Sequence, residues 1–293
     1  MRDLSRRTAV LAALTLSFAS SAAFAQSRPR GRRGRRDGEG AGRSASPHET
    51  IPTGPDPLQA YDLYSADATD GPILAFVHGG GWSRGDKSMV HDLPAYAERH
   101  GLTLASIGYR LVPAVTPREQ ASDVAAALAD LIRTHPGRPV FVMGHSAGAH
   151  LAALVGVDPS YLVEEGVQPA DLGGVMLLDG AGYDATGDRG DGFAGRMLGQ
   201  MYAQAFGDQA AALSPTLRVR GRQTYPPFLI FHIASRADSR AQSEALAVAL
   251  RNAGGQAEVI SAPNDSHRDI NLGFGVAGDP EGERAARFIS APR

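Results

Sequence analysis

The sequence predicts an α/β fold, in which helices cover both faces of a mostly parallel central sheet. From Gly71 onward, short apolar runs of strand type alternate with segments of helical periodicity, as strand–helix–strand units do. The apolar runs also lack the polar alternation of a half-exposed sheet, which indicates strands buried on both faces. The 293 residues are 43% hydrophobic and 20% charged, an ordinary globular composition that excludes collagen-like, coiled-coil and fully disordered proteins.

The expected elements follow from length and periodicity. Six short apolar runs are predicted strands, at residues 73–77, 102–107, 140–143, 175–178, 228–233 and 257–261. Residues 117–135 and 241–252 carry apolar side chains at helical spacing and are predicted helices. Residues 182–224 are rich in glycine and arginine and weakly periodic, so we expect an excursion that partly covers the functional edge of the sheet.

The first 25 residues have the order of a signal peptide. Ser5-Arg6-Arg7-Thr8 precedes an apolar run, and the small-residue pattern Ala23-Phe24-Ala25 follows as a cleavage site. The arginine pair resembles a twin-arginine export signal, with a Sec signal as the alternative. We therefore expect an exported protein, periplasmic or secreted, that begins near Gln26. The apolar run is too short to span a bilayer, so no transmembrane segment is expected.

Residues 26–50 are predicted to be a disordered arm, followed by one domain over 51–293. Between residues 28 and 43 there are seven arginines against two acidic residues, with no apolar periodicity. Such an arm could contact anionic lipid or cell-wall polymer, although a flexible spacer is favoured, and export argues against nucleic acid.

One motif has the context of a catalytic serine. Gly144-His-Ser-Ala-Gly148 directly follows the predicted strand 140–143 and opens a helical pattern over 149–155. The two glycines permit a turn too tight for a Cβ, which would hold the hydroxyl of Ser146 out over the strand ends. Ser146 is therefore the candidate nucleophile. The alternative is an ordinary turn before a helix.

Three glycines follow the predicted strand 73–77, in His78-Gly-Gly-Gly-Trp82. Their N–H groups are unshielded by side chains and could bind the oxyanion of a tetrahedral intermediate. We assign this role to the N–H groups of Gly80, Gly81 and Ala147, with Gly79 as a substitute. A plain flexible loop is the alternative. Trp82 is a candidate for substrate binding, with core packing as the equal alternative.

A serine nucleophile needs a base and an orienting acid, in the chain order Ser, acid, His for this fold. His267 lies in a polar loop after the last predicted strand and is the candidate base, whereas His232 lies inside an apolar strand and is interpreted as structural. Asp238, in the loop after strand 228–233, is the predicted acid. Asp179 and Asp184, after strand 175–178, are its competitors.

These motifs together resemble the α/β-hydrolases, over about residues 51–289. The HGGG-type loop at 78–81 and the segment Gly108-Tyr-Arg-Leu-Val-Pro113 are similar to the hormone-sensitive-lipase-like carboxylesterases. The stretch 144–151 is also similar to kynurenine formamidases and to bacterial feruloyl and xylan esterases. One departure is Ser235-Arg-Ala-Asp-Ser-Arg240, where lipase-like members commonly have Asp-Pro-Leu-x-Asp.

The resemblance implies a serine carboxylesterase that hydrolyses small to medium acyl esters through an acyl-enzyme. The alternatives are an arylformamidase of the kynurenine formamidase type and a non-catalytic hydrolase fold used for binding. No cofactor and no metal are expected, because the sequence has no P-loop, dinucleotide fingerprint or metal-ligand spacing. The absence of cysteine also excludes disulfides and a cysteine nucleophile. The expected partner is a small ester substrate.

Overall fold

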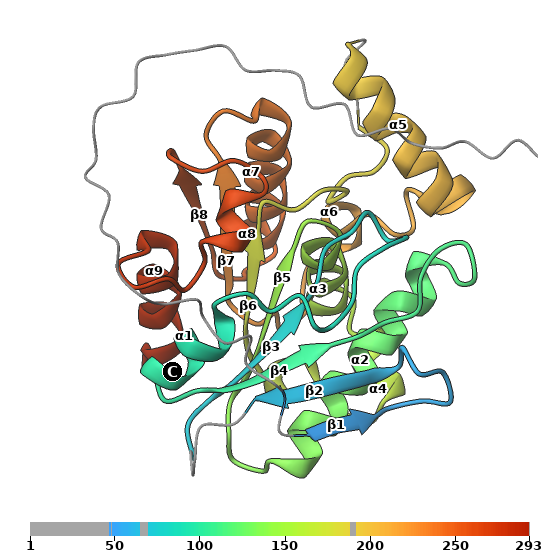
Figure 1. Cartoon of the computed structure of the whole chain (residues 1–293). Helices are drawn as coiled ribbons and strands as arrows, with labels where there is room; N and C mark the ends of the chain where they lie inside the picture. The colour runs from blue at the N-terminus through green and yellow to red at the C-terminus, as the bar shows by residue number, and fades with distance from the viewer. Residues whose placement is uncertain (1–46, 48, 65–69, 188–191, 293) are drawn as a thin grey trace, which may run out of the picture. The chain divides into compact units, whose positions relative to one another are not determined.

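The protein is described by a computed structural model that covers residues 47, 49–64, 70–187 and 192–292. The described residues form an eight-stranded sheet in the order β1-β2-β4-β3-β5-β6-β7-β8, with helices on both faces (Figure 1). Strand β2 pairs antiparallel with β1 and β4, and the remaining described pairs are parallel. The predicted fold class, a mostly parallel sheet covered by helices, is confirmed.

The six predicted strands and the two predicted helices are all present, with bounds that agree to within a few residues. The strands are β1 (Glu49–Pro52), β2 (Ala60–Tyr64), β3 (Ile73–Val77), β4 (Thr103–Ile107), β5 (Val140–His145), β6 (Leu172–Leu178), β7 (Phe228–Ile233) and β8 (Ala257–Ala262). The helices are α1 (Leu93–Arg99), α2 (Pro117–Thr134), α3 (Ala147–Val157), α4 (Ser160–Glu164), α5 (Phe193–Phe206), α6 (Pro215–Arg218), α7 (Ala237–Asn252), α8 (Asp269–Leu272) and α9 (Pro280–Ser290).

Several of the described elements were not predicted. The expected excursion 182–224 contains helices α5 and α6. Strands β1 and β2 form the antiparallel edge of the sheet, and β1 is short and largely exposed, so it lacks the apolar run that identified the buried strands. Glu49 and Thr50, which we placed at the end of the arm, already belong to β1. The signal peptide and the arm up to residue 46 lie outside the described residues.

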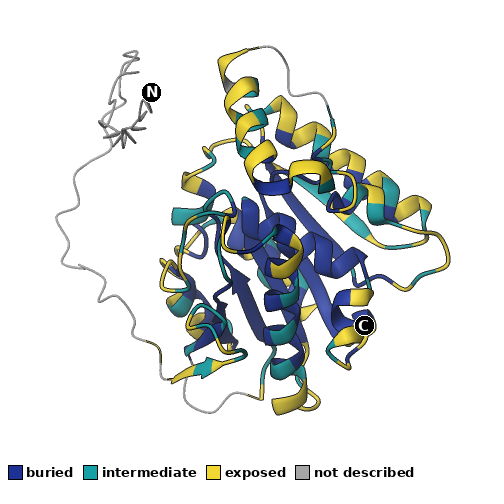
Figure 2. Ribbon diagram, turned by 90° about the vertical axis from the view of Figure 1, so that its right-hand side faces the viewer, coloured by how far each residue is buried: buried dark blue, intermediate teal, exposed yellow. Residues whose placement is uncertain are grey.

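The central strands divide the core into two apolar layers. In β3, Ile73, Ala75 and Val77 point to one face of the sheet, while Leu74 and Phe76 point to the other. Helices α2, α3 and α7 cover the first face, and α1 and α9 cover the second. Because both faces are covered, the central strands are buried along their whole length, as Figure 2 shows in dark blue.

Parallel pairing brings the candidate chemistry to one edge of the sheet. The glycine loop at 78–82 follows β3, Ser146 follows β5, Asp179 follows β6, and His267 lies in the loop after β8. Strands β3, β5, β6, β7 and β8 run in the same direction, so their carboxyl ends share this edge. In open α/β sheets this is where ligands bind.

Helix α3 packs unusually close to β3 through a glycine. A Cβ on Gly148 would lie 2.1 Å from the carbonyl oxygen of Val77 and 2.4 Å from that of His78. A Cβ on Gly144 would lie 2.3 Å from the carbonyl oxygen of Gly148, across the turn between β5 and α3. The two glycines therefore set the distance between the start of α3 and the ends of β3 and β5.

We expect Gly148→Ala to destabilise the protein by about 3 kcal/mol, because the new methyl group meets backbone atoms that cannot move independently of β3. The measurement is the free energy of unfolding in urea. Gly221→Ala is the matched control, since nothing lies within 4 Å of its Cβ position. Equal unfolding free energies of the two variants would contradict the close packing.

Candidate active site

Ser146 occupies a strained turn at the tip of strand β5. Its φ of 56° and ψ of −118° lie outside the regions that non-glycine residues ordinarily adopt. The turn persists because the N–H of Ser146 donates to the carbonyl of Leu178 and because α3 begins at the next residue, Ala147. Strain at this one residue presents the hydroxyl at the carboxyl edge of the sheet, as the motif predicted.

His267 reaches this hydroxyl from the loop that follows β8. Its Nε2 lies 3.1 Å from Oγ of Ser146, which is hydrogen-bonding distance for a proton acceptor. The imidazole side chain is 41% exposed, so it stands at the surface of the site. The structure therefore brings together the serine and the histidine that the sequence singled out.

The carboxylate that contacts this histidine is Asp179, at the end of β6. Its Oδ2 lies 2.5 Å from Nδ1 of His267. Asp179 has a positive φ of 42° and is fully buried. Its Oδ1 accepts hydrogen bonds from the N–H of Ile233 and from the hydroxyl of Ser239. Both carboxylate oxygens are thus held in place before any substrate arrives.

Electrostatics keep Asp179 ionised despite its burial. Burial by itself would raise the pKa of this carboxyl. The hydrogen bond from His267, the positive charge of Arg236 and the hydroxyl of Ser239 outweigh burial and hold the pKa of Asp179 well below its ordinary value. The acid is therefore a fixed negative charge behind the imidazole, which selects the tautomer protonated at Nδ1 and leaves Nε2 free to accept a proton.

Asp238, the acid that the sequence predicted, does not contact His267. Helix α7 begins at Ala237, so Asp238 lies in its first turn, where a carboxylate is favoured by the helix dipole. Its side chain is 44% exposed and pairs with Arg236 at 2.8 Å. The structure corrects the expectation: the strand before β7, not β7 itself, supplies the orienting carboxylate. Asp184, the other competitor, accepts hydrogen bonds from Thr186 instead.

The glycine loop adjoins the serine turn. A Cβ on Gly79 would lie 3.2 Å from Cβ of Ser146, so Gly79 is the loop residue in direct contact with the turn. Gly80 has a φ of 129°, and a Cβ there would lie 2.0 Å from the carbonyl oxygen of Arg84. Among the described residues, no backbone carbonyl accepts a hydrogen bond from the N–H of Gly80 or Gly81.

The loop and the helix therefore present free donors. Ala147 is the first residue of α3, where an N–H has no acceptor within the helix. This leaves donors from two segments beside Ser146, the arrangement that an oxyanion needs. On the outer side of the loop, a Cβ on Gly81 would lie 3.0 Å from Sδ of Met201, which comes from helix α5.

Trp82 lies in the core, where it supports the loop. Its side chain is 0% exposed, so it does not line an open substrate site. Its indole N–H donates to Nδ1 of His150, and Nε2 of His150 contacts the carbonyl of Leu213 at 2.7 Å. Gln120 donates to the carbonyl of Trp82. Of the two roles left open for Trp82, packing is the one observed.

His145, inside the serine motif, contacts the loop that carries His267, and the sequence had not indicated this role. Its Nε2 lies 2.9 Å from the backbone carbonyl oxygen of His267, and the two rings are 4.7 Å apart. Burial, followed by the neighbouring His267, lowers the pKa of His145 to about 4. A neutral His145 donates this hydrogen bond from Nε2 and so holds the backbone of the loop that carries His267. No spacing rule in the sequence indicated the contact.

The arrangement fits nucleophilic attack by a serine. A hydroxyl beside an imidazole, which a buried carboxylate orients, is the constellation of acyl-transfer hydrolases. In the described ranges, no three His, Cys, Asp or Glu side chains cluster so as to hold a metal ion. No helix in those ranges is long and apolar enough to cross a membrane.

We expect Asp179→Asn to lower kcat by roughly 10⁴-fold, because an amide would favour the wrong imidazole tautomer and would not stabilise an imidazolium. Asp238→Asn should retain activity to within about tenfold, since a partly exposed ion pair contributes little. The measurement is the steady-state hydrolysis of p-nitrophenyl acetate. A larger loss in Asp238→Asn than in Asp179→Asn would restore Asp238 as the acid.

His150 should make the stability of the fold depend on pH. Burial lowers the pKa of His150 to about 4, so between pH 6.5 and about 4 the unfolded chain binds a proton that the folded chain excludes. Stability therefore falls as the pH falls through this window. His150→Gln should reduce this dependence by about 1.4 kcal/mol per pH unit. Urea unfolding at several pH values measures the slope, and an unchanged slope would show that His150 is protonated in the fold.

Comparison with known proteins supports the same fold. A family model described as alpha/beta hydrolase fold matches residues 74–270. Over 252 residues the chain is 27% identical to a probable isoprenylcysteine alpha-carbonyl methylesterase of Arabidopsis thaliana, covering 76% of this chain and 51% of that protein. The chain spans 51% to 57% of the length of this and two further methylesterases that it matches. It is also 33% identical over 101 residues to a kynurenine formamidase of Meyerozyma guilliermondii, covering 34% of this chain and 39% of that protein.

Solved structures agree in fold. Esterase B of Lactobacillus rhamnosis is 24% identical with a TM-score of 0.65, covering 82% of this chain and 84% of its own. Thermogutta terrifontis esterase 2, phosphonylated by sarin, is 20% identical with a TM-score of 0.68, covering 88% of this chain and 100% of its own. The family match spans most of the chain. The chain therefore belongs to the alpha/beta hydrolase family.

Proposed function

We propose that this protein is an exported serine carboxylesterase that hydrolyses small to medium acyl esters. The observation that carries the proposal is the continuous contact from Ser146 Oγ through His267 to Asp179, with distances of 3.1 and 2.5 Å. The contact stands beside free backbone donors at the carboxyl edge of the sheet. An arrangement of this kind hydrolyses acyl compounds without a cofactor.

The reaction has two half-steps. His267 takes the proton of the Ser146 hydroxyl at Nε2 as Oγ attacks the carbonyl carbon of the ester. The oxyanion is bound by the N–H of Ala147 and by N–H groups of the loop 79–81. The tetrahedral intermediate expels the alcohol, which receives the proton from His267. Water then attacks the acyl-enzyme, with His267 again as the base, and the acid is released.

Two observations support an apolar acyl group. Phe193, Met197 and Met201 recur at every fourth position of α5, so they share one face of that helix. Phe193 and Met197 are 74% and 52% exposed, while Met201 lies against the glycine loop at Gly81. The Thermogutta terrifontis esterase 2, similar in fold, has structures with propionate and with butyrate bound. An aliphatic chain leaving the oxyanion site would meet this apolar face.

A formamidase activity is the second candidate. Similarity to the kynurenine formamidase of Meyerozyma guilliermondii reaches 33% identity, although over only 101 residues. Hydrolysis of a formamide would use the same serine, base and donors, and would differ in the protonation of an amine leaving group. We propose export on the strength of the arginine pair, the apolar run and the cleavage pattern at residues 1–25. Export favours the ester over the formamide, because tryptophan catabolism, in which kynurenine formamidases act, is usually intracellular.

The experiment compares p-nitrophenyl acetate, butyrate and octanoate with N-formylkynurenine, using protein that begins at Gln26. We expect ester turnover to exceed formamide turnover and Ser146→Ala to lower it by roughly 10⁶-fold, because the nucleophile is removed while the fold is retained. Ser88→Ala is the matched control, since Ser88 is exposed and binds Asp86 rather than a residue of the triad.

The possible results of this experiment distinguish the esterase from the formamidase and from a non-catalytic fold. A preference for N-formylkynurenine that depends on Ser146 would move the activity to the formamidase. Turnover that survives in Ser146→Ala would reject the serine mechanism. Failure of the wild-type protein on all four substrates, with no labelling by a fluorophosphonate, would favour the non-catalytic binding fold.

A further inference from the structure

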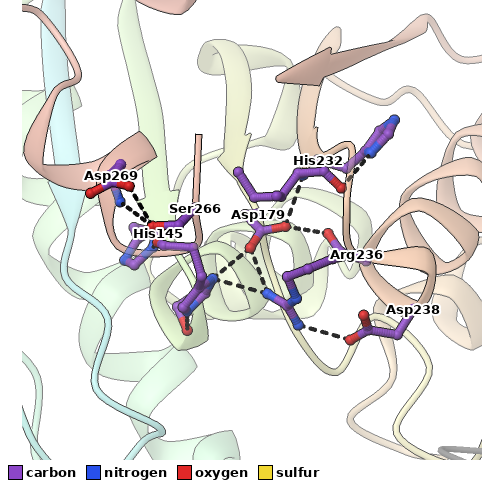
Figure 3. A network of polar contacts seen from close by, with 11 residues as sticks. His145, Asp179, His232, Arg236, Asp238, Ser266 and Asp269 are labelled. Carbon is purple, nitrogen blue, oxygen red and sulfur yellow. Dashed lines mark hydrogen bonds and ion pairs between the residues drawn. The ribbon is translucent and has the colours of Figure 1, made fainter. Parts of the chain in front are cut away.

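Arg236 places a positive charge on the Asp179–His267 pair. Its Nη1 lies 2.5 Å from Oδ2 of Asp179, and its Nη2 lies 2.8 Å from Oδ2 of Asp238 (Figure 3). Nη1 also lies 3.0 Å from Nδ1 of His267. One guanidinium thus contacts the orienting acid, the base and a second carboxylate. An arginine is suited to this because its planar fork offers several donors in fixed directions.

The fold holds Arg236 in this position. It lies between β7 and α7, as the residue that caps the amino end of the helix, and its side chain is 27% exposed. Its partner Asp179 is fully buried, whereas Asp238 is 44% exposed. The guanidinium therefore joins the buried carboxylate of Asp179 to the partly exposed carboxylate of Asp238.

Oδ2 of Asp179 is shared between two donors. His267 must carry its proton on Nδ1 in order to donate to this oxygen. Nδ1 then cannot also accept from Arg236, so the 3.0 Å approach is a contact between the cation and the edge of the imidazole. The positive charge of Arg236 disfavours a second positive charge on the imidazole ring. Arg236 also neutralises part of the negative charge of Asp179, which would otherwise stabilise an imidazolium.

Six other titratable or charged groups lie near Asp179, His267 and Arg236. The groups that interact with them or with His145, or lie within two residues of His267, are His91, His145, Tyr183, Asp265, Arg268 and Asp269. His145 is neutral at ordinary pH because burial lowers its pKa to about 4. Asp269 is engaged by the hydroxyl of Ser266. Within the described part of the chain, no other cation forms a hydrogen bond or ion pair with Asp179.

We propose that Arg236 is a positioning residue that shares Asp179 with His267 and, with Asp238 moderating its charge, sets the position of the acid limb in the pH profile of activity. The inference rests on the proposed function, in which Ser146 is the nucleophile and His267 the base. The proton of Ser146 moves to His267 as before, and Arg236 gains and loses none. Its effect is electrostatic, through its contacts with Asp179 and with the edge of the imidazole.

Arg236→Gln removes the charge and retains hydrogen-bonding capacity. We expect the acid limb of its kcat/KM profile for p-nitrophenyl acetate to move to higher pH by about one pH unit, because the whole charge of Asp179 then stabilises the imidazolium. Arg236→Lys keeps the charge and should leave the limb near its wild-type position. Asp238→Asn removes the moderating charge and should move the limb to lower pH.

Arg240→Gln is the matched control for charge. Arg240 lies one turn further along α7, is 59% exposed and pairs with Glu244, so its loss changes the net charge equally without touching the triad. The acid limb of this variant should coincide with that of the wild type. The rate at which a fluorophosphonate labels Ser146, measured over the same pH range, gives a second profile that does not depend on the choice of ester.

The outcomes separate this inference from the proposed function. If the wild-type protein neither hydrolyses the ester nor reacts with the fluorophosphonate, the proposed function fails. If it does react, and Arg236→Gln loses activity while its acid limb stays in place, Arg236 is only structural and the inference is overturned. Should Arg236→Gln not fold, as judged by circular dichroism, Asp238→Asn decides: an unmoved limb in that variant also overturns the inference.

Discussion

The close packing of α3 against the ends of β3 and β5 is the constraint on which the site depends. The carbonyl oxygens of Val77 and His78 occupy the space that a side chain at Gly148 would need. The turn between β5 and α3 therefore holds Ser146 in a strained conformation. The strain is tolerated because the surrounding strands and α3 are buried. Once the turn is set, the hydroxyl, the amide of Ala147 and the contact with Gly79 are placed relative to one another by backbone geometry.

Around that turn, the side chains are organised by the buried charge of Asp179. A carboxylate without solvent needs donors, and each of its oxygens receives two: Ile233 and Ser239 on one, His267 and Arg236 on the other. The same contacts that make burial tolerable also orient the imidazole. Stability and the proposed chemistry therefore use one set of hydrogen bonds, and the partly exposed Arg236 connects that set to Asp238 at the surface.

Two neutral histidines, His145 and His150, support the site through hydrogen bonds rather than through charge. His150 joins the core residue Trp82 to the carbonyl of Leu213, and His145 joins the serine turn to the backbone of the loop that carries His267. Burial lowers the pKa of both to about 4, so at neutral pH each has one donor and one acceptor nitrogen. They act as fixed hydrogen-bonding links that add no charge beside the base.

The sequence by itself determined the fold class and singled out Ser146, His267 and the glycine loop as candidate site residues, because each follows from a local pattern: apolar runs for buried strands, glycines where a Cβ cannot fit, and a polar loop after the last strand. Only the tertiary structure decided between Asp179 and Asp238. Both follow strands at the same edge, and the choice depends on where α7 begins and which way each carboxylate points. It likewise placed Trp82 in the core and Arg236 on the acid, because contacts between residues distant in the chain arise from strand order and packing, which no local spacing records.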